Sequence, residues 1–298
     1  MEGKIKIDPP YLENLIAKGS PSIFGSWLKQ LSKIRTEFKS AEPFESVVID
    51  NFLNEEYAEQ LYTLFPENFN DWYVYENPIE VKYAFDNINH LESPLKDYFY
   101  HLSTPDIVSV FSYISGINEL EYDEYLHGAG LHSHPRHGRL QIHLDYEKHP
   151  YSGKERRLNI ILFLSKDWKE EWNGHNELWG TDLKKCVRKT AVKFNRAIIF
   201  KTNDVSFHGL PEKIQCPPNV FRKSLAYYYV SPVDSNVESN EEEGYIKKNY
   251  RKKAAFFPSM SDGHVPNPNM EKLCKIRNER LITKTDVEEL FPNWKKED

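Results

Sequence analysis

Residues 138–146 read GRLQIHLDY, a run in which apolar and polar side chains alternate. This alternation is typical of a β-strand, because successive residues of a strand point to opposite faces. The strand would therefore direct His143 and Asp145 to one face as two neighbouring metal ligands. Its other face would carry three apolar side chains toward a core: Leu140, Ile142 and Leu144. With eleven histidines in the chain, such a pair also arises by chance, so further ligands are needed.

The stretch around this strand, from about residue 118 to 232, predicts a mainly β fold with flanking helices. Its short alternating or β-branched runs are separated by Gly, Pro and Asn, which favour turns. The clearest runs are NELEYDEYL, GRLQIHLDY, RRLNIILFLS, HNELWG, CVRKTAVKF, RAIIFKT and KSLAYYYVSP. Seven or eight short strands at this spacing indicate a sandwich or jelly roll.

The preceding residues predict helices. Residues 1–42 are expected to form a helical extension, with one helix at 9–19 and a second that carries four apolar residues at helical spacing: Ile23, Trp27, Leu31 and Ile34. Residues 43–53 then predict a short strand. A helix should follow, with Asn54 as its N-cap and Pro66 as its stop. Residues 93–117 predict two more helices, the first capped by Ser93.

The domain organisation follows from these patterns. The main domain is predicted over residues 43–232, with its β core at about 118–232. Residues 233–298 predict a polar linker and a partly helical tail, which ends in a short helix with Thr285 or Asp286 near its cap.

Composition excludes several classes of partner. The net charge is −6, so no general basic field would attract nucleic acid or an acidic membrane surface. The short basic runs KERR and YIKKNYRKK are expected on solvated faces. No apolar stretch approaches the length of a signal peptide core or a membrane span. Three widely spaced cysteines indicate a reducing, cytoplasmic location.

Two later stretches supply partners for the first ligand pair. His208 follows the apolar run RAIIF, and Arg222 and Ser224 share one face of a later strand with Ala226 and Tyr228. Two histidines and one carboxylate form a facial triad, which leaves three positions of an octahedral Fe(II) open for a bidentate cosubstrate and O2. A cosubstrate with a remote carboxylate also needs a buried cation, and arginine suits this role because it stays charged and pairs bidentately.

In this order, the motifs resemble the Fe(II)- and 2-oxoglutarate-dependent oxygenases, in their prolyl-4-hydroxylase-like branch. The resemblance covers residues 43–232, about two thirds of the chain. Its most specific stretch runs from HLDYEKHP through RRLNIILFLSKDW to NELW. The later stretches FNRAIIFKTNDVSFHG and FRKSLAYYY complete the order.

The resemblance implies a double-stranded β-helix that holds Fe(II) through His143, Asp145 and His208, without other catalytic residues. Arg222 and Ser224 would bind the distal carboxylate of the cosubstrate 2-oxoglutarate. The resemblance also implies that Tyr125 and Asn159 contact the cosubstrate. The implied enzyme is a dioxygenase that hydroxylates an unactivated C–H bond of a small molecule or a peptide side chain, with release of succinate and CO2. We also expect a homodimer.

The sequence departs from this family pattern in two places. Phe163 stands where prolyl hydroxylases often have a tyrosine, so one hydrogen bond to the cosubstrate would be missing, and Ser224 would compensate. The interval from Tyr125 to His143 is longer than in those enzymes, and the stretch HGAGLHSHPRHG that it carries, residues 127–138, is expected to form a lid or loop near the metal. Its four histidines do not have zinc-site spacing.

Two other functions fit the β pattern. One is a catalytically silent β-helix that acts as a binding or scaffold module. This function is disfavoured because a silent module has no reason to keep all four of the residues His143, Asp145, His208 and Arg222. The other is a cupin-like metalloenzyme, such as an isomerase, which does not use 2-oxoglutarate and so needs no Arg222–Ser224 pair.

Overall fold

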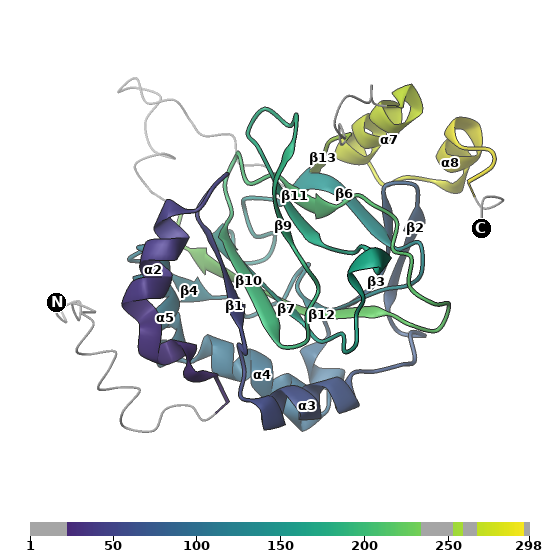
Figure 1. The fold of residues 1–298 in the computed structure, drawn as a ribbon. Coiled ribbons are helices and arrows are strands. Elements are labelled where there is room, and N and C mark those ends of the chain that lie inside the picture. Colours follow the sequence, from purple (N-terminus) through teal and green to yellow (C-terminus); the bar gives the residue numbers. More distant parts are fainter. Residues whose placement is uncertain (1–22, 234–252, 259–266, 295–298) are drawn as a thin grey trace, which may run out of the picture.

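The alternating runs form one antiparallel sheet that curls into a nearly closed barrel with flanking helices (Figure 1). The computed structural model describes residues 23–233, 253–258 and 267–294. The predicted jelly roll is thus confirmed, whereas the helix expected at 9–19 lies outside the described residues. Along the sheet the strands follow the order β1-β10-β7-β12-β5-β3-β6-β11-β8-β9. Three more strands pair at its sides: β13 with β6, β2 with β3, and β4 with β12.

The strands are short, as the sequence runs predicted. Their bounds are β1 Ser46–Asp50, β2 Tyr73–Asn77, β3 Glu80–Phe85, β4 Glu121–Tyr122, β5 Gly130–His134, β6 Arg139–Leu144, β7 Glu155–Phe163, β8 Asn176–Trp179, β9 Cys186–Thr190, β10 Arg196–Lys201, β11 His208–Leu210, β12 Arg222–Ser231 and β13 Ala255–Phe256. The helices are α2 Leu31–Ser40, α3 Glu55–Leu64, α4 Ser93–Ser103, α5 Pro105–Ser115, α7 Pro268–Glu279 and α8 Lys284–Leu290.

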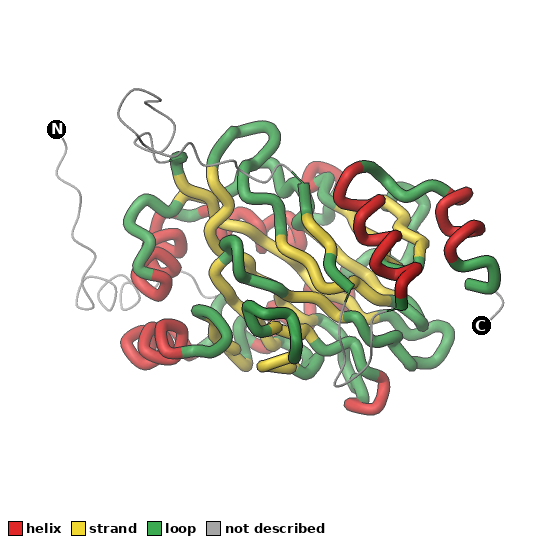
Figure 2. The backbone as a smooth tube through the Cα atoms, turned by 90° about the horizontal axis from the view of Figure 1, so that it is seen from above, coloured by secondary structure: helices red, strands yellow, loops and turns green. Residues whose placement is uncertain are grey.

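The helices gather at two sides of the sheet. Figure 1 shows α2 to α5 together on one side, with α7 and α8 at the opposite end beside β13 and β6. Figure 2, seen from above, shows the strands running between these two groups. None of the helices in the described ranges is long and apolar enough to cross a membrane.

The main core lies between α2 to α5 and the outer face of the sheet. Trp27 stacks on Phe52 with 5.4 Å between ring centroids, and Phe111 contacts Tyr229 at 5.2 Å. Tyr229 donates its hydroxyl to the carbonyl of Leu102. Because side chains alternate along β12, this packing leaves the intervening residues on the inner face of the barrel.

The predicted helix caps are partly right. The side chain of Asn54 accepts a hydrogen bond from the backbone N–H of Tyr57, as expected of an N-cap. Ser93 does not cap α4, because it is the first residue of that helix and donates its hydroxyl to Asp97. Thr283, not Thr285, caps α8, and Asp286 completes a capping box with it.

The hairpin of β2 and β3 was not predicted. The side chain of Asn77 accepts hydrogen bonds from the backbone N–H groups of Ile79 and Glu80 and so fixes the turn. β3 then pairs with both β5 and β6. It therefore joins the two parts of the barrel wall and brings residues of an N-terminal segment to the interior.

Gly130 is predicted to be needed where β5 begins beside β3. Its φ is +86°, and an added Cβ would lie 2.1 Å from the carbonyl oxygen of Phe85. Gly130→Ala should therefore lower the free energy of unfolding by about 1–3 kcal/mol, measured by denaturant titration. Gly180→Ala is the control, because the atom nearest its added Cβ is a side-chain oxygen of Asp182 at 3.3 Å. Equal stability of the two variants would contradict the prediction.

Candidate metal centre

Three predicted ligands converge inside the barrel. β11 pairs with β6 so that His208 lies opposite His143, and Asp145 is the first residue after β6. The Nε2 atoms of His143 and His208 each lie 3.7 Å from a carboxylate oxygen of Asp145. All three side chains are buried, and their ligand atoms lie within 4.8 Å of one another. In the described part of the chain, no other group of three or more such residues could hold a metal ion.

Hydrogen bonds orient both imidazoles toward this centre. The Nδ1 of His143 lies 3.0 Å from the carbonyl oxygen of Gln141, and the Nδ1 of His208 lies 2.8 Å from that of Ser206. A proton on Nδ1 leaves the Nε2 lone pair available as a ligand. Burial and the neighbouring His208 lower the pKa of His143 to about 3, so its ring is neutral at neutral pH. The donor set therefore fits a divalent cation.

Asp145 is held as a carboxylate despite its burial. Burial alone would raise its pKa, but the interactions with the neighbouring histidines, the Arg156 guanidinium and the Asn159 amide outweigh burial and lower the pKa overall. The amide of Asn159 donates to one carboxylate oxygen at 3.3 Å, and the hydroxyl of Tyr228 lies 3.4 Å from the other. These contacts fix the orientation of the carboxylate.

Arg222 lies buried in the same cavity, which has a volume of about 720 Å³. Its Nε donates to the carbonyl of Gly174 at 2.7 Å, and its guanidinium packs on the ring of Phe163 at 4.8 Å. Burial lowers its pKa to about 9, so it keeps its proton at neutral pH. Ser224 is also buried, and its hydroxyl has no hydrogen-bond partner among the described residues. The two groups are thus placed for a carboxylate that enters the cavity.

The histidine-rich stretch does not form the expected lid or loop. Its central part is strand β5, where His132 lies opposite Ser224 and His134 opposite Arg222. Both rings line the cavity, and burial lowers their pKa values well below the ordinary value. The period of two, visible in HSH, was the signal for a strand. These neutral rings therefore belong to the cavity wall.

Arg156 was missed, because the run KERR was expected on a solvated face. Tyr229 pairs with Leu158, but the next residue, Val230, pairs with Arg156, so the pairing skips Arg157. A bulge of this kind re-aims the side chains beyond it. It turns Arg156 into the cavity, where the guanidinium lies 3.9 Å from Asp145.

The surroundings of Arg156 keep it charged. Its guanidinium lies between two aromatic rings, 3.6 Å from the Tyr146 centroid and 3.4 Å from that of Tyr228. It also donates to the carbonyl of His127 at 2.7 Å. Burial works to lower the pKa of Arg156, but these tyrosines and the nearby carboxylates raise it overall.

The two further predicted contacts differ in position. Asn159 is buried beside Asp145, and in the part of the chain that the structure describes its side-chain oxygen has no hydrogen-bond partner. Tyr125 lies in the loop after β4, not on a strand, and 49% of its surface is exposed. Its ring contacts those of His149 and Tyr151 at the side of the cavity.

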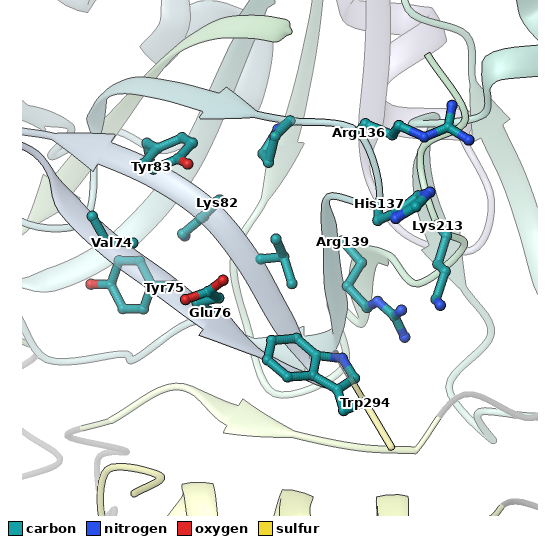
Figure 3. Close-up of a pocket in the computed structure, with 12 residues that line it drawn as sticks. Val74, Tyr75, Glu76, Lys82, Tyr83, Arg136, His137, Arg139, Lys213 and Trp294 are labelled. Carbon is teal, nitrogen blue, oxygen red and sulfur yellow. The ribbon is translucent and has the colours of Figure 1, made fainter. Parts of the chain in front are cut away.

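A smaller cavity of about 200 Å³ lies beside the first and shares Tyr75 and Lys82 with it. Figure 3 shows four basic side chains in this smaller cavity across from Tyr75, Glu76 and Trp294: Arg136, His137, Arg139 and Lys213. None of the three predicted ligands lines it. The site of chemistry is therefore the larger cavity.

Comparison with known proteins agrees with this constellation. Residues 129–230 match a family model described as the 2OG-Fe(II) oxygenase superfamily. A search of curated proteins gives no match.

Solved structures similar to this chain include three prolyl hydroxylases. One, from Trichoplax adhaerens in complex with a peptide fragment of hypoxia inducible factor, has 16% identity and a TM-score of 0.48, over 70% of this chain and 94% of that one. A Pseudomonas putida prolyl-4-hydroxylase has 13% identity and a TM-score of 0.46, over 68% and 100%. A Phytophthora capsici prolyl 4-hydroxylase has 16% identity and a TM-score of 0.47, over 99% and 83%.

Buried and half-buried histidines predict a loss of stability in mild acid. Burial is the main cause that lowers the pKa below 6.5 in seven of them: His101, His127, His132, His134, His143, His149 and His175. As the pH falls through 6.5, the unfolded chain therefore binds more protons than the folded chain. The denaturation midpoint of the metal-free protein should fall from pH 7.5 to pH 5.5. A midpoint that does not change over this range would contradict the assignment.

Proposed function

We propose that this chain is a 2OG-Fe(II) oxygenase that hydroxylates an unactivated C–H bond of a small molecule or a side chain, supported by the match of residues 129–230 to the model of that superfamily. The observation that carries the proposal is the convergence of His143, Asp145 and His208 in a cavity that also contains Arg222. When bound, Fe(II) with 2-oxoglutarate and O2 supplies the oxidising chemistry, with succinate and CO2 as the coproducts.

His143, Asp145 and His208 would hold the iron. Two neutral nitrogen donors and one carboxylate are the ligand set of a facial triad. The Nδ1 contacts to backbone oxygens direct both Nε2 atoms inward. Arg156, Asn159 and Tyr228 would act as positioning residues, because each contacts the carboxylate of Asp145.

Arg222 and Ser224 would bind the distal carboxylate of 2-oxoglutarate. The Nε of Arg222 is already bound to Gly174, so its two terminal nitrogens remain to form a bidentate pair with the carboxylate. The unpartnered hydroxyl of Ser224 would add a hydrogen bond and replace the one that Phe163 lacks. Asn159 would reach the cosubstrate through the second N–H of its side-chain amide, since the amide already donates to Asp145. Tyr125 stays a prediction as a cosubstrate contact.

The cavity and its arginine favour this function over the two alternatives. A silent binding module has no need for two oriented imidazoles around a buried carboxylate. A cupin-like enzyme without 2-oxoglutarate has no need for Arg222, whose burial as a cation costs free energy without a partner anion. The volume of about 720 Å³ is sufficient for a cosubstrate and a small substrate or single side chain together.

Loss of one metal ligand is predicted to abolish the centre. Wild-type protein with Fe(II) and 2-oxoglutarate under anaerobic conditions should show the weak visible absorption band of the chelate, and should form succinate in air. His143→Ala should lose the band. It should also bind Fe(II) more than about 100-fold more weakly, because even the loss of a residue that only hydrogen-bonds a metal ligand weakens metal binding by about 10–100-fold. His90→Ala is the control, since His90 is exposed. A wild-type protein without band or succinate would refute the proposed function.

Arg222→Gln tests the cosubstrate site separately. It should weaken 2-oxoglutarate binding by about 2–5 kcal/mol, because the anion loses its buried charge partner. Ser224→Ala should cost about 1 kcal/mol, the contribution of one hydrogen bond. Both variants should bind Fe(II) normally, as measured by metal titration. Normal 2-oxoglutarate binding by Arg222→Gln would show that the carboxylate binds elsewhere.

A further inference from the structure

A segment beyond the matched residues forms one wall of the proposed active site. Strand β13 pairs with β6, so that Phe256 lies opposite His143. The two rings are stacked, with 5.3 Å between centroids and 20° between planes. Residues of β13 and α7 line the cavity together with the triad. The chain after residue 252 therefore takes part in the site.

Arg277, on α7, contacts the same Phe256 ring. Its guanidinium carbon is 5.0 Å from the centroid of Phe256, and its side chain lines the cavity. Phe256 thus lies in contact with both Arg277 and His143. Through this ring, the cation of Arg277 is held close to the proposed metal centre. Arg277 forms no hydrogen bond or ion pair with any residue in the described ranges.

The backbone around Arg277 is firmly anchored. The side-chain oxygen of Asn278 accepts from the backbone N–H of Phe256 at 2.6 Å, and its amide donates to the carbonyl of Phe256 at 3.0 Å. Leu273 and Cys274 of α7 pack with Ile79 and Phe256 in a buried cluster. Because these contacts fix the helix, binding an anion to Arg277 requires little ordering of the backbone.

Other cations lie on the same side of the cavity. Lys82 is half-buried and lies between Glu80, at 3.1 Å, and the ring of Tyr75, at 5.2 Å. Lys253 lines the rim and donates to the carbonyl of Glu279. Among the described residues, Glu80 is paired with Lys82, whereas Arg277 has no acidic partner within ion-pair distance. In the described part of this rim, Arg277 and Lys253 therefore add positive charge that Glu80 does not balance.

We propose that Arg277 is a substrate-recognition residue, and that it binds a carboxylate or phosphate group of the substrate while the reacting carbon lies near the triad. This inference rests on the proposed function. It narrows the substrate class to anionic small molecules or acidic side chains. Arginine is suited to this role because its planar fork binds carboxylate and phosphate bidentately.

A binding experiment tests the site without any reaction. Metal-free protein with ¹⁵N-labelled arginine is titrated with inorganic phosphate and, separately, with acetate, while the Nε–H resonances are followed. The Arg277 signal, assigned by its loss in Arg277→Gln, should shift with at least one anion. Arg277→Gln should also bind that anion at least 10-fold more weakly. Lys275→Gln, an exposed change on the same helix, should bind it normally.

A turnover experiment identifies which anion is recognised. Succinate release by wild-type enzyme is compared for matched pairs: glutamate with glutamine, aspartate with asparagine, and glucose 6-phosphate with glucose. The anionic member of at least one pair should stimulate release more strongly. Arg277→Gln should raise the KM for that substrate at least 10-fold with kcat within about 2-fold, and Arg277→Lys should recover part of the loss. A stronger response to the anionic member in the amino-acid pairs alone would indicate that Arg277 recognises a carboxylate. A stronger response to glucose 6-phosphate than to glucose would indicate that it recognises a phosphate.

The outcomes separate this inference from the proposed function. If the Arg277 resonance does not shift, or if neutral members are as effective as anionic ones, the anion site is wrong even where the 2-oxoglutarate chelate forms. If the wild-type chelate does not form, the oxygenase function fails, and the phosphate titration still decides whether Arg277 binds anions. Weakened Fe(II) binding in Arg277→Gln would instead show that its role is to support Phe256 and His143, and would overturn the inference.

Discussion

The pairing of β11 with β6 is the constraint on which the site depends. It places His208 opposite His143 and leaves Asp145 between their Nε2 atoms, in the buried interior of the barrel. A buried carboxylate is stable only where charges and hydrogen bonds replace the lost water. Arg156, Asn159 and Tyr228 fulfil this requirement from β7 and β12. The ligands of the metal site thus also determine which polar residues the neighbouring strands need.

Residues that follow strict alternation could be predicted from the sequence. A period of two gave the shared face of His143 and Asp145, and that of Arg222 and Ser224, because neither stretch is interrupted. Arg156 could not be found in this way. The irregular pairing at Arg157 reverses the alternation, and no residue type in the run marks a bulge. Buried polar residues beside a site are therefore missed where the strand departs from its period.

Strand pairings between segments that lie far apart in the chain could also not be predicted from the sequence. β3 contacts β5 and β6, and β13 contacts β6, across long intervals of chain, and nothing in either segment specifies its partner strand. Local signals did identify α2 to α5 and the final helix α8, and the N-cap Asn54 of α3, because these features depend on neighbouring residues alone. The sequence thus revealed the metal-binding half of the cavity, while the half formed by the hairpin and the C-terminal segment became visible only in three dimensions.

This division has a physical basis. The proposed iron and 2-oxoglutarate contacts lie on β6, β7, β11 and β12 or directly after them, where ladder hydrogen bonds hold each backbone in place. The opposite wall, with Lys82 and Arg277, comes from elements added around that barrel. We expect substitutions in this opposite wall to change the charge and shape of the cavity without moving a metal ligand. Phe256 is the exception, because its ring contacts both the metal-ligand candidate His143 and the proposed substrate-recognition residue Arg277.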